Sequence, residues 1–397
     1  MDNITTSFVI DPIRNFGILL EAGMSDLLEN HKLYGGMLFM TNFRNGDLFG
    51  EYQYLKNRVD FKVRFDRKVI QFNLNPEQSL AQKYSLNSIT FGASYPINNA
   101  LRVSFNPFFA FTNFSNLERN FVSGNPGQIE FAPNDTQNYG GFKSELVFDN
   151  TKIHALNLYE GTRAKLSFSS YTGLTSIDKS FTNVSFDLRN YKRLHREITF
   201  ATRLYYNGFF GKNKQNNLLG GVDNWIFRGD DPVRLEDDRS VPPNYPFILK
   251  NEVDNSGILF SEVVSNLRGY NFGRLFGSNV LLFNAELRFP VFLYLSDGPI
   301  ASNFLRNFQL VGFYDFGSAW TGKPPLTREN SVNTFRVETD TQFDATIKSF
   351  RNPWLSSYGF GLRTVVLGYY VRLDWARPVE NFEAGDFRFH LSLGYDF

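Results

Sequence analysis

Apolar and polar residues alternate one by one through many segments of this chain. The last segment, FRFHLSLGYDF over 387–397, shows this most clearly. Its apolar positions are Phe387, Phe389, Leu391, Leu393, Tyr395 and Phe397. Successive side chains of a β-strand point to opposite faces, so a period of two predicts a strand with one apolar face and one polar face.

The same alternation predicts about sixteen strands, separated by turn-forming residues. We expect them near 4–12, 14–25, 33–44, 47–56, 57–72, 84–97, 100–115, 138–150, 159–173, 180–192, 196–211, 278–289, 306–320, 358–363, 369–376 and 387–397. An even number of strands is consistent with an all-β, antiparallel barrel closed by a single chain.

Alternation of this kind occurs in soluble β-sandwiches and in membrane-spanning β-barrels. A sandwich buries its apolar face against a second sheet, whereas an outer-membrane barrel turns that face to lipid and lines a wet lumen with the polar one. The composition favours the barrel. The chain is polar overall, with 20% charged residues and a mean hydropathy of −0.30, but it is also rich in aromatic residues, with 44 Phe and 19 Tyr. No run of roughly 18 apolar residues occurs, which excludes a protein that spans the membrane with helices.

Charge and cysteine content narrow the possible partners only slightly. The formal net charge of +1 gives no electrostatic argument for binding a nucleic acid. The chain has no cysteine, so cysteine usage does not indicate whether the protein works in an oxidising or a reducing compartment. The start, MDNITTSFVI, lacks the basic stretch and apolar core of a signal peptide, so we expect an exported protein to be present here as a mature fragment.

The predicted connections fall into short and long ones. Short turns are expected at 96–100, 190–196 and 367–370, and long loops near 116–137, 212–276 and 321–355. Outer-membrane barrels combine short periplasmic turns with longer extracellular loops in this way. Loop 212–276 is the longest, and a loop of that length inside a compact domain is usually functional.

One part of loop 212–276 and the two strands after it carry a family resemblance. Residues 268–270 read RGY, the next strand contains AELRFP (285–290), and the strand after it reads GFYDFGSAW (312–320). This combination resembles the BamA and TamA superfamily of outer-membrane assembly factors. The resemblance implies a sixteen-stranded transmembrane barrel whose sixth extracellular loop folds back into the lumen with an Arg-Gly-aromatic tip.

Carried over residue by residue, the family motif predicts a lumenal latch. Its members are Arg268, Gly269, Tyr270, Glu286, Phe313, Asp315 and Gly317. The alternation agrees independently, because Glu286 and Asp315 lie on the polar faces of their strands. A guanidinium between two carboxylates makes charge-assisted hydrogen bonds. The alternatives are that Arg268 is a solvated loop residue, or that Arg228 of FRGD fills the role.

The resemblance also implies a seam where the last strand pairs with the first to close the barrel. The predicted seam residues are Phe8, Ile10, Leu391, Leu393, Gly394 and Phe397. In the family a glycine kinks the last strand, and Gly394 stands at the matching place. The alternative is that every such barrel ends in Phe, so Phe397 supports the outer-membrane location more than the insertion activity.

An enzymatic role is not expected. The four histidines, His31, His154, His195 and His390, are scattered without metal-ligand spacing, and no thiol is present. The acidic run 235–239 is either a calcium site or, more commonly, a solvated loop. We therefore predict no catalytic residue, no metal and no cofactor.

The resulting interpretation is an outer-membrane insertion factor formed by one barrel domain over 1–397. Its predicted partners are outer-membrane lipids, unfolded outer-membrane protein clients, and a periplasmic domain or accessory lipoproteins. The family's periplasmic repeats precede the barrel and are not in this chain, and the segment 25–33 looks more like barrels of the Bacteroidota. The alternative is a two-partner secretion transporter that passes polypeptide through the lumen. A passive pore is disfavoured, because loop 212–276 is expected to plug it.

Overall fold

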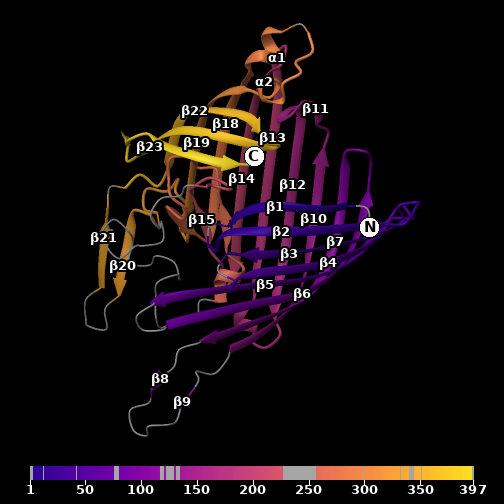
Figure 1. The fold of residues 1–397 in the computed structure, drawn as a ribbon. Coiled ribbons are helices and arrows are strands. Elements are labelled where there is room, and N and C mark those ends of the chain that lie inside the picture. The colour runs from indigo at the N-terminus through magenta and orange to yellow at the C-terminus, as the bar shows by residue number, and fades with distance from the viewer. Residues whose placement is uncertain are drawn as a thin grey trace.

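The structure is a computed structural model, and it describes most of the chain (Figure 1). The described residues are 3–11, 13–41, 43–75, 80–116, 120–121, 129–130, 135–226, 256–296, 298–330, 332–338, 344–349 and 351–395. Arg228, the acidic run 235–239 and Phe397, all singled out from the sequence, lie outside these ranges.

One antiparallel sheet of 18 strands contains almost all of the described β-structure. Its long strands are β1 (Asn3–Asp11), β2 (Asn15–Ser25), β3 (His31–Met40), β4 (Gly46–Tyr54), β5 (Asp60–Asn75), β6 (Leu80–Pro96), β7 (Leu101–Asn116), β10 (Asp135–Asp149), β12 (Leu158–Gly173), β13 (Phe181–His195), β14 (Ile198–Gly211), β18 (Asn279–Pro290), β19 (Gln309–Trp320), β22 (Leu355–Val366), β23 (Tyr369–Glu380) and β25 (Arg388–Leu393). The short ones are β11 (Lys152–Ala155) and β24 (Glu383–Ala384). This confirms the predicted fold class, an all-β antiparallel sheet of about sixteen long strands.

Each long strand pairs with the next long strand along the chain, so the sheet is an up-and-down meander that curls around an interior (Figure 1). Strand β13 continues to His195, so the turn predicted over 190–196 is shorter than expected.

Smaller elements lie in the connections. They are β8 (Asn120–Phe121), β9 (Ile129–Glu130), β15 (Asn217–Leu219), β16 (Glu262–Val264), β17 (Leu275–Gly277), β20 (Thr334–Glu338), β21 (Asp344–Lys348), the 3-10 helices η1 (Ile177–Lys179) and η2 (Ser256–Leu259), and the helices α1 (Val291–Leu295) and α2 (Asn303–Arg306). The helices α1 and α2 lie at one end of the barrel, and the β8–β9 and β20–β21 hairpins lie towards the other (Figure 1). Among the described residues, no helix has the length and apolar character needed to cross a membrane.

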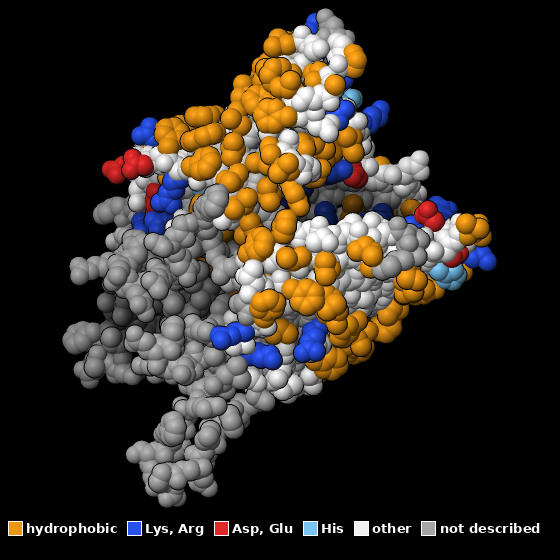
Figure 2. Space-filling model, viewed as in Figure 1, with side chains coloured by type: hydrophobic (Ala, Val, Ile, Leu, Met, Phe, Trp, Pro, Cys, Tyr) orange, Lys and Arg blue, Asp and Glu red, His pale blue; other side chains and the backbone are white. Residues whose placement is uncertain are grey.

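The two faces of the strands have opposite character, and the apolar one is outside. On β25, Phe389 is 47% exposed whereas the next residue, His390, is fully buried. On β19, Tyr314 is 44% exposed and Asp315 is fully buried. Figure 2 shows hydrophobic side chains spread over the outer surface of the strands. The predicted inversion, with apolar side chains outward and polar ones inward, is therefore confirmed.

Candidate functional site: the loop inside the barrel

The described parts of the connection from β14 to β18 return into the barrel and pack against its inner wall. Its strands β15, β16 and β17 form a small sheet of their own, with β15 in the middle. Side chains of this sheet and of the barrel share one buried apolar cluster. Its members are Leu219, Val264, Leu267, Tyr270, Val280, Leu282, Ala319 and Leu355. The loop is thus anchored by a core of the kind that stabilises globular domains.

Gly317 makes room for the loop at the barrel wall. A Cβ atom at this position would lie 2.9 Å from the carbonyl oxygen of Leu281 and 3.2 Å from Cδ2 of Leu219. Leu219 belongs to β15 and is fully buried. The glycine predicted for the latch therefore sits where β15 of the returning loop packs against β19.

Arg268 lies in the centre of the contact, 3% exposed. Its Nε and Nη2 donate hydrogen bonds to Oδ2 and Oδ1 of Asp315, each 2.7 Å long, which is the bidentate geometry that a planar guanidinium favours. Its Nη1 donates to Oε1 of Glu286 at 2.7 Å. The guanidinium carbon lies 3.7 Å from the centre of the Phe313 ring, so a cation–π contact covers its remaining face.

A second arginine and an asparagine extend the buried network. Arg288, fully buried, donates from Nε and Nη2 to Oε2 of Glu286 at 2.9 and 2.7 Å. Asn284 donates from its side-chain nitrogen to Oδ1 of Asp315 at 2.8 Å and to the carbonyl of Asn266 at 2.6 Å.

A third buried carboxylate, Asp374, lies 3.9 Å from Nη1 of Arg268 and 2.9 Å from Nη1 of Arg363. The buried charges thus occur in opposite pairs, which offsets their desolvation.

The two residues after Arg268 connect the loop to the last strands. Gly269 has a φ of +86° and lies so close to Pro378 that a Cβ would be 3.2 Å from its ring nitrogen. Its N–H donates to Nε2 of His390 at 3.0 Å. The hydroxyl oxygen of Tyr270 lies 2.8 Å from the carbonyl oxygens of both Ser356 and Val379. The tip therefore spans from β18 and β19 across to β22, β23 and β25.

The structure brings together all seven residues predicted for the lumenal latch, whose functional role stays a prediction. Three further participants, Arg288, Asn284 and His390, were not singled out for it. The first two share a face with Glu286, since side chains two residues apart on a strand point the same way. His390 also lies on a polar strand face, but alternation alone does not reveal that a loop amide points at it.

The arrangement is suited to holding a loop in place. Removing one member of a buried, hydrogen-bonded charge set typically costs about 3 to 5 kcal/mol. Within the described part of the chain, no group of three or more His, Cys, Asp or Glu residues could hold a metal ion.

The seam differs from the expected direct pairing of the first and last strands. Within the described residues β1 pairs with β2, and β25 pairs with β23, but the two are not paired with each other. Phe8 of β1 instead lies against Tyr369 of β23, with ring centres 5.8 Å apart. The reason is that residues of loop 212–276 occupy the edge of β25, so β1 cannot reach it there.

The remaining seam residues have the orientation that alternation predicts. Leu391 and Leu393 are partly exposed on the outer face of β25, and Ile10 is partly exposed on β1. The strand ends at Leu393, and Gly394 follows with a φ of +101°, a conformation that favours glycine. Gly394 N–H donates to the carbonyl of Tyr370 at 2.9 Å, so the chain turns here while still attached to β23.

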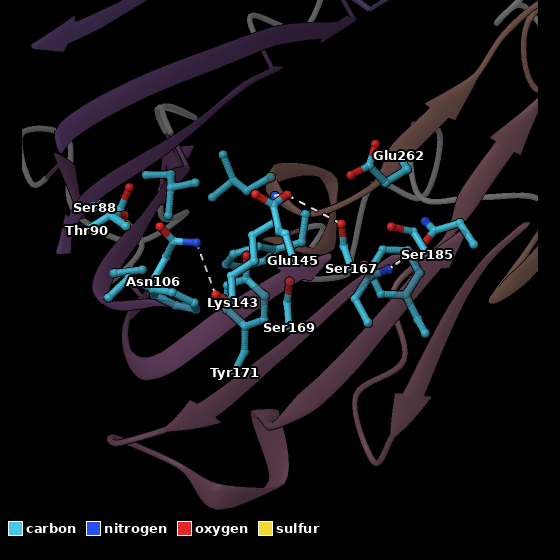
Figure 3. Close-up of a pocket in the computed structure, with 18 of the residues that line it drawn as sticks. Ser88, Thr90, Asn106, Lys143, Glu145, Ser167, Ser169, Tyr171, Ser185 and Glu262 are labelled. Carbon is cyan, nitrogen blue, oxygen red and sulfur yellow. Dashed lines mark hydrogen bonds and ion pairs between the residues drawn. The ribbon is translucent and has the colours of Figure 1, made fainter. Parts of the chain in front are cut away.

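Part of the lumen is left open beside the loop (Figure 3). The cavity has a volume of about 800 Å³ and is lined by charged, hydroxyl and aromatic side chains. Lys143 and Lys165 both lie within ion-pair distance of Glu145, at 3.1 and 2.8 Å. Glu262 of the loop faces the same space (Figure 3). Such a lining is suited to water rather than to a small apolar ligand.

Comparison with solved structures identifies the architecture. BamA from Haemophilus ducreyi lacking POTRA domains 1–3 matches 99% of this chain and 75% of its own, with a TM-score of 0.58 at 12% identity. The fold is that of the BamA barrel. CdiB from Acinetobacter baumannii and CdiB from Escherichia coli match 98% of this chain at 14% and 10% identity, each with a TM-score of 0.49. This chain spans 58% and 61% of those two chains.

Comparisons at the level of sequence give no match. No family model matches the chain, and no curated protein does.

Proposed function

We propose that this chain is a barrel of the BamA superfamily in a bacterial outer membrane, where lipid surrounds its apolar outer face. The support is the orientation of the strands. Large apolar side chains such as Phe105 and Phe109 on β7 are about half exposed, at 50% and 53%, while charged groups such as Asp315 are buried inside. A water-soluble protein rarely exposes so continuous an apolar surface.

We further propose that the barrel inserts other outer-membrane proteins through the seam between β1 and β25. The observation that supports this most is that, over the residues that the structure describes, β1 and β25 are not paired with each other. A strand edge without its barrel neighbour offers backbone N–H and C=O groups, apart from those of Leu391 and Leu393 that bond to loop 212–276, and a client strand adds to such an edge by β-augmentation. The expected clients are unfolded outer-membrane proteins. Three further statements stay predictions: the accessory lipoproteins, the periplasmic domain and the absence of enzymatic activity.

The test is insertion of an unfolded outer-membrane protein into vesicles that contain this barrel. Folding of the client is followed by its heat-modifiable mobility on a gel, against empty vesicles of the same lipid. We expect faster folding with the barrel present. Equal rates in both kinds of vesicle would contradict the proposal.

A photo-crosslinking amino acid then locates the client. At Leu391 on the seam we expect crosslinks to the client, and at Phe109 on β7, which also faces outward, we expect none. Crosslinks confined to a residue that lines the cavity, such as Ser185, would contradict insertion at the seam.

The alternative function is secretion of a polypeptide through the lumen, and the cavity of about 800 Å³ favours it. In that mechanism loop 212–276 has to leave the barrel, because it now packs against the inner wall. For a transporter, we expect the secreted substrate to accumulate inside the vesicles. We also expect crosslinks at Ser185 and none at Leu391.

A further inference from the structure

A short segment of loop 212–276, residues 223–226, lies on the free edge of the last strand. Trp225 pairs with Ser392 in the antiparallel sense. The N–H of Ile226 donates to the carbonyl of Leu391 at 2.9 Å, and the N–H of Leu393 donates to the carbonyl of Asn224 at 3.3 Å. These are the hydrogen bonds that a neighbouring strand of the sheet makes. We call residues 223–226 the seam segment.

The seam segment also contacts the other side of the seam. The side-chain oxygen of Asn224 accepts a hydrogen bond from the backbone N–H of Ile10 at 3.3 Å. Asn224 has a φ of +51°, so the backbone leaves the strand conformation at this residue. One residue thus bonds to β25 through its backbone and to β1 through its side chain.

Further contacts tie the seam segment to the rest of the barrel. Asp223 accepts hydrogen bonds through its carboxylate from Ser265 and Asn266, which precede the latch in the same loop. The carbonyl of Asp223 accepts from Nη2 of Arg372 at 2.9 Å. The segment is therefore held from the loop side and from β23.

Trp225 anchors the seam segment inside the barrel. It is 5% exposed, and its ring centre lies 4.4 Å from that of His390 and 6.1 Å from that of Phe272. The same His390 accepts the hydrogen bond from Gly269 N–H. One side chain of β25 therefore touches both the anchor of the seam segment and the tip of the lumenal latch.

We propose that the seam segment is a resident strand that occupies the client site on β25 and must be displaced before a client strand adds there. This rests on the proposed insertion at the seam. The seam segment makes two backbone hydrogen bonds with β25, whose six residues offer a longer ladder to an incoming strand. When a client strand displaces the seam segment, β25 exchanges a short strand pairing for a longer one. Because His390 contacts both Trp225 and Gly269, this displacement is linked to the latch.

A disulfide that locks the seam segment tests this. Trp225 and Ser392 form a non-hydrogen-bonded pair, in which the Cα atoms of antiparallel strands are about 4.5 Å apart, within the range that a disulfide spans. The chain has no cysteine of its own, so Trp225→Cys with Ser392→Cys forms a single bond. We expect the oxidised variant to insert clients no faster than empty vesicles and the reduced variant to recover.

The matched control is Leu218→Cys with Phe276→Cys. These residues face each other between β15 and β17, so the disulfide joins two parts of the same loop and leaves the seam segment free. We expect this variant to insert clients equally well when oxidised and reduced. If the oxidised seam variant inserts clients as fast as the wild type, the proposal of a resident strand is refuted. Insertion by the wild type in the same experiment supports the proposed function independently. If the wild type itself inserts nothing, it is the proposed function that fails.

A second measurement does not depend on insertion. A peptide with the alternating aromatic pattern of a client's last strand is added to the reduced seam variant, and the rate of disulfide formation is measured. We expect a slower rate than with a scrambled peptide of the same composition, because the client peptide displaces the seam segment. Equal rates would overturn the proposal. Should the double variant fail to fold, Trp225→Ala replaces it, with tighter binding of the client peptide as the expected result and unchanged binding as the refuting one.

Discussion

Two of the contacts between loop 212–276 and the barrel differ in construction. At the lumenal latch, Arg268 makes three side-chain hydrogen bonds of 2.7 Å to two buried carboxylates. At the seam, residues 223–226 make two backbone hydrogen bonds and place one indole ring against His390. Buried charges are expensive to separate, whereas strand pairing can be exchanged for other strand pairing. We infer that the lumenal latch is a lasting attachment of the loop and that the seam segment is a replaceable one.

The largest expected effect comes from removing the latch arginine. Arg268→Ala leaves Asp315 and Glu286 buried without it, and we expect a loss of about 3 to 5 kcal/mol in the free energy of unfolding. Denaturant unfolding of the barrel in detergent measures this. Arg274→Ala is the matched control from the same loop, because its ion pair with Glu380 is partly exposed on both sides, at 29% and 28%, and is worth about 0 to 1 kcal/mol. Similar losses in the two variants would contradict a lasting attachment at Arg268.

Removing the shared histidine is expected to weaken both attachments. His390→Ala deprives the N–H of Gly269 of its acceptor and removes the ring beneath Trp225, for which we expect a loss of about 1 to 3 kcal/mol. His390→Asn keeps a hydrogen-bond acceptor, so we expect a smaller loss in the free energy of unfolding than for His390→Ala. Unfolding of both variants, combined with Arg268→Ala, measures the coupling. Strict additivity would show that His390 does not connect the two attachments.

A smaller effect is expected from Tyr270→Phe. The hydroxyl lies between the carbonyls of Ser356 and Val379, and its loss should lower the free energy of unfolding by about 0.5 to 1.5 kcal/mol. The same unfolding experiment detects it. A loss as large as that of Arg268→Ala would mean that the tyrosine, rather than the charge network, holds the tip.

The smallest effect on global unfolding is expected from Trp225→Ala. If the attachment at the seam is replaceable, the seam segment opens while the barrel stays folded, so the loss of its Trp225 anchor changes local exchange more than global stability. We expect faster hydrogen exchange at the N–H groups of Ile226 and Leu393, with the N–H of Gly269 as the reference. A global loss as large as that of Arg268→Ala would erase the difference between the two attachments.

Sequence reasoning predicted the barrel and the latch for different reasons. Strict alternation places Glu286 and Asp315 on inward faces, because a strand has no other way to arrange successive side chains. The position of Arg268 came from the family resemblance, since a loop has no periodicity from which to predict it. The pairing of Trp225 with Ser392 could not be predicted, because it depends on how a long loop folds in three dimensions. The direct pairing of β1 with β25 was expected from the family and is absent from the described residues, where the loop lies between them.

The brevity of β25 has a consequence for the proposed bilayer next to the seam. A strand needs about 9 to 11 residues to cross the hydrocarbon layer, and β25 has six, from Arg388 to Leu393. If lipid surrounds the barrel as proposed, the acyl chains beside this strand meet a hydrogen-bonded strand shorter than the hydrocarbon layer. They have to compress or tilt there, as expected from hydrophobic mismatch. The bilayer would then be thinnest at the place where a client enters it.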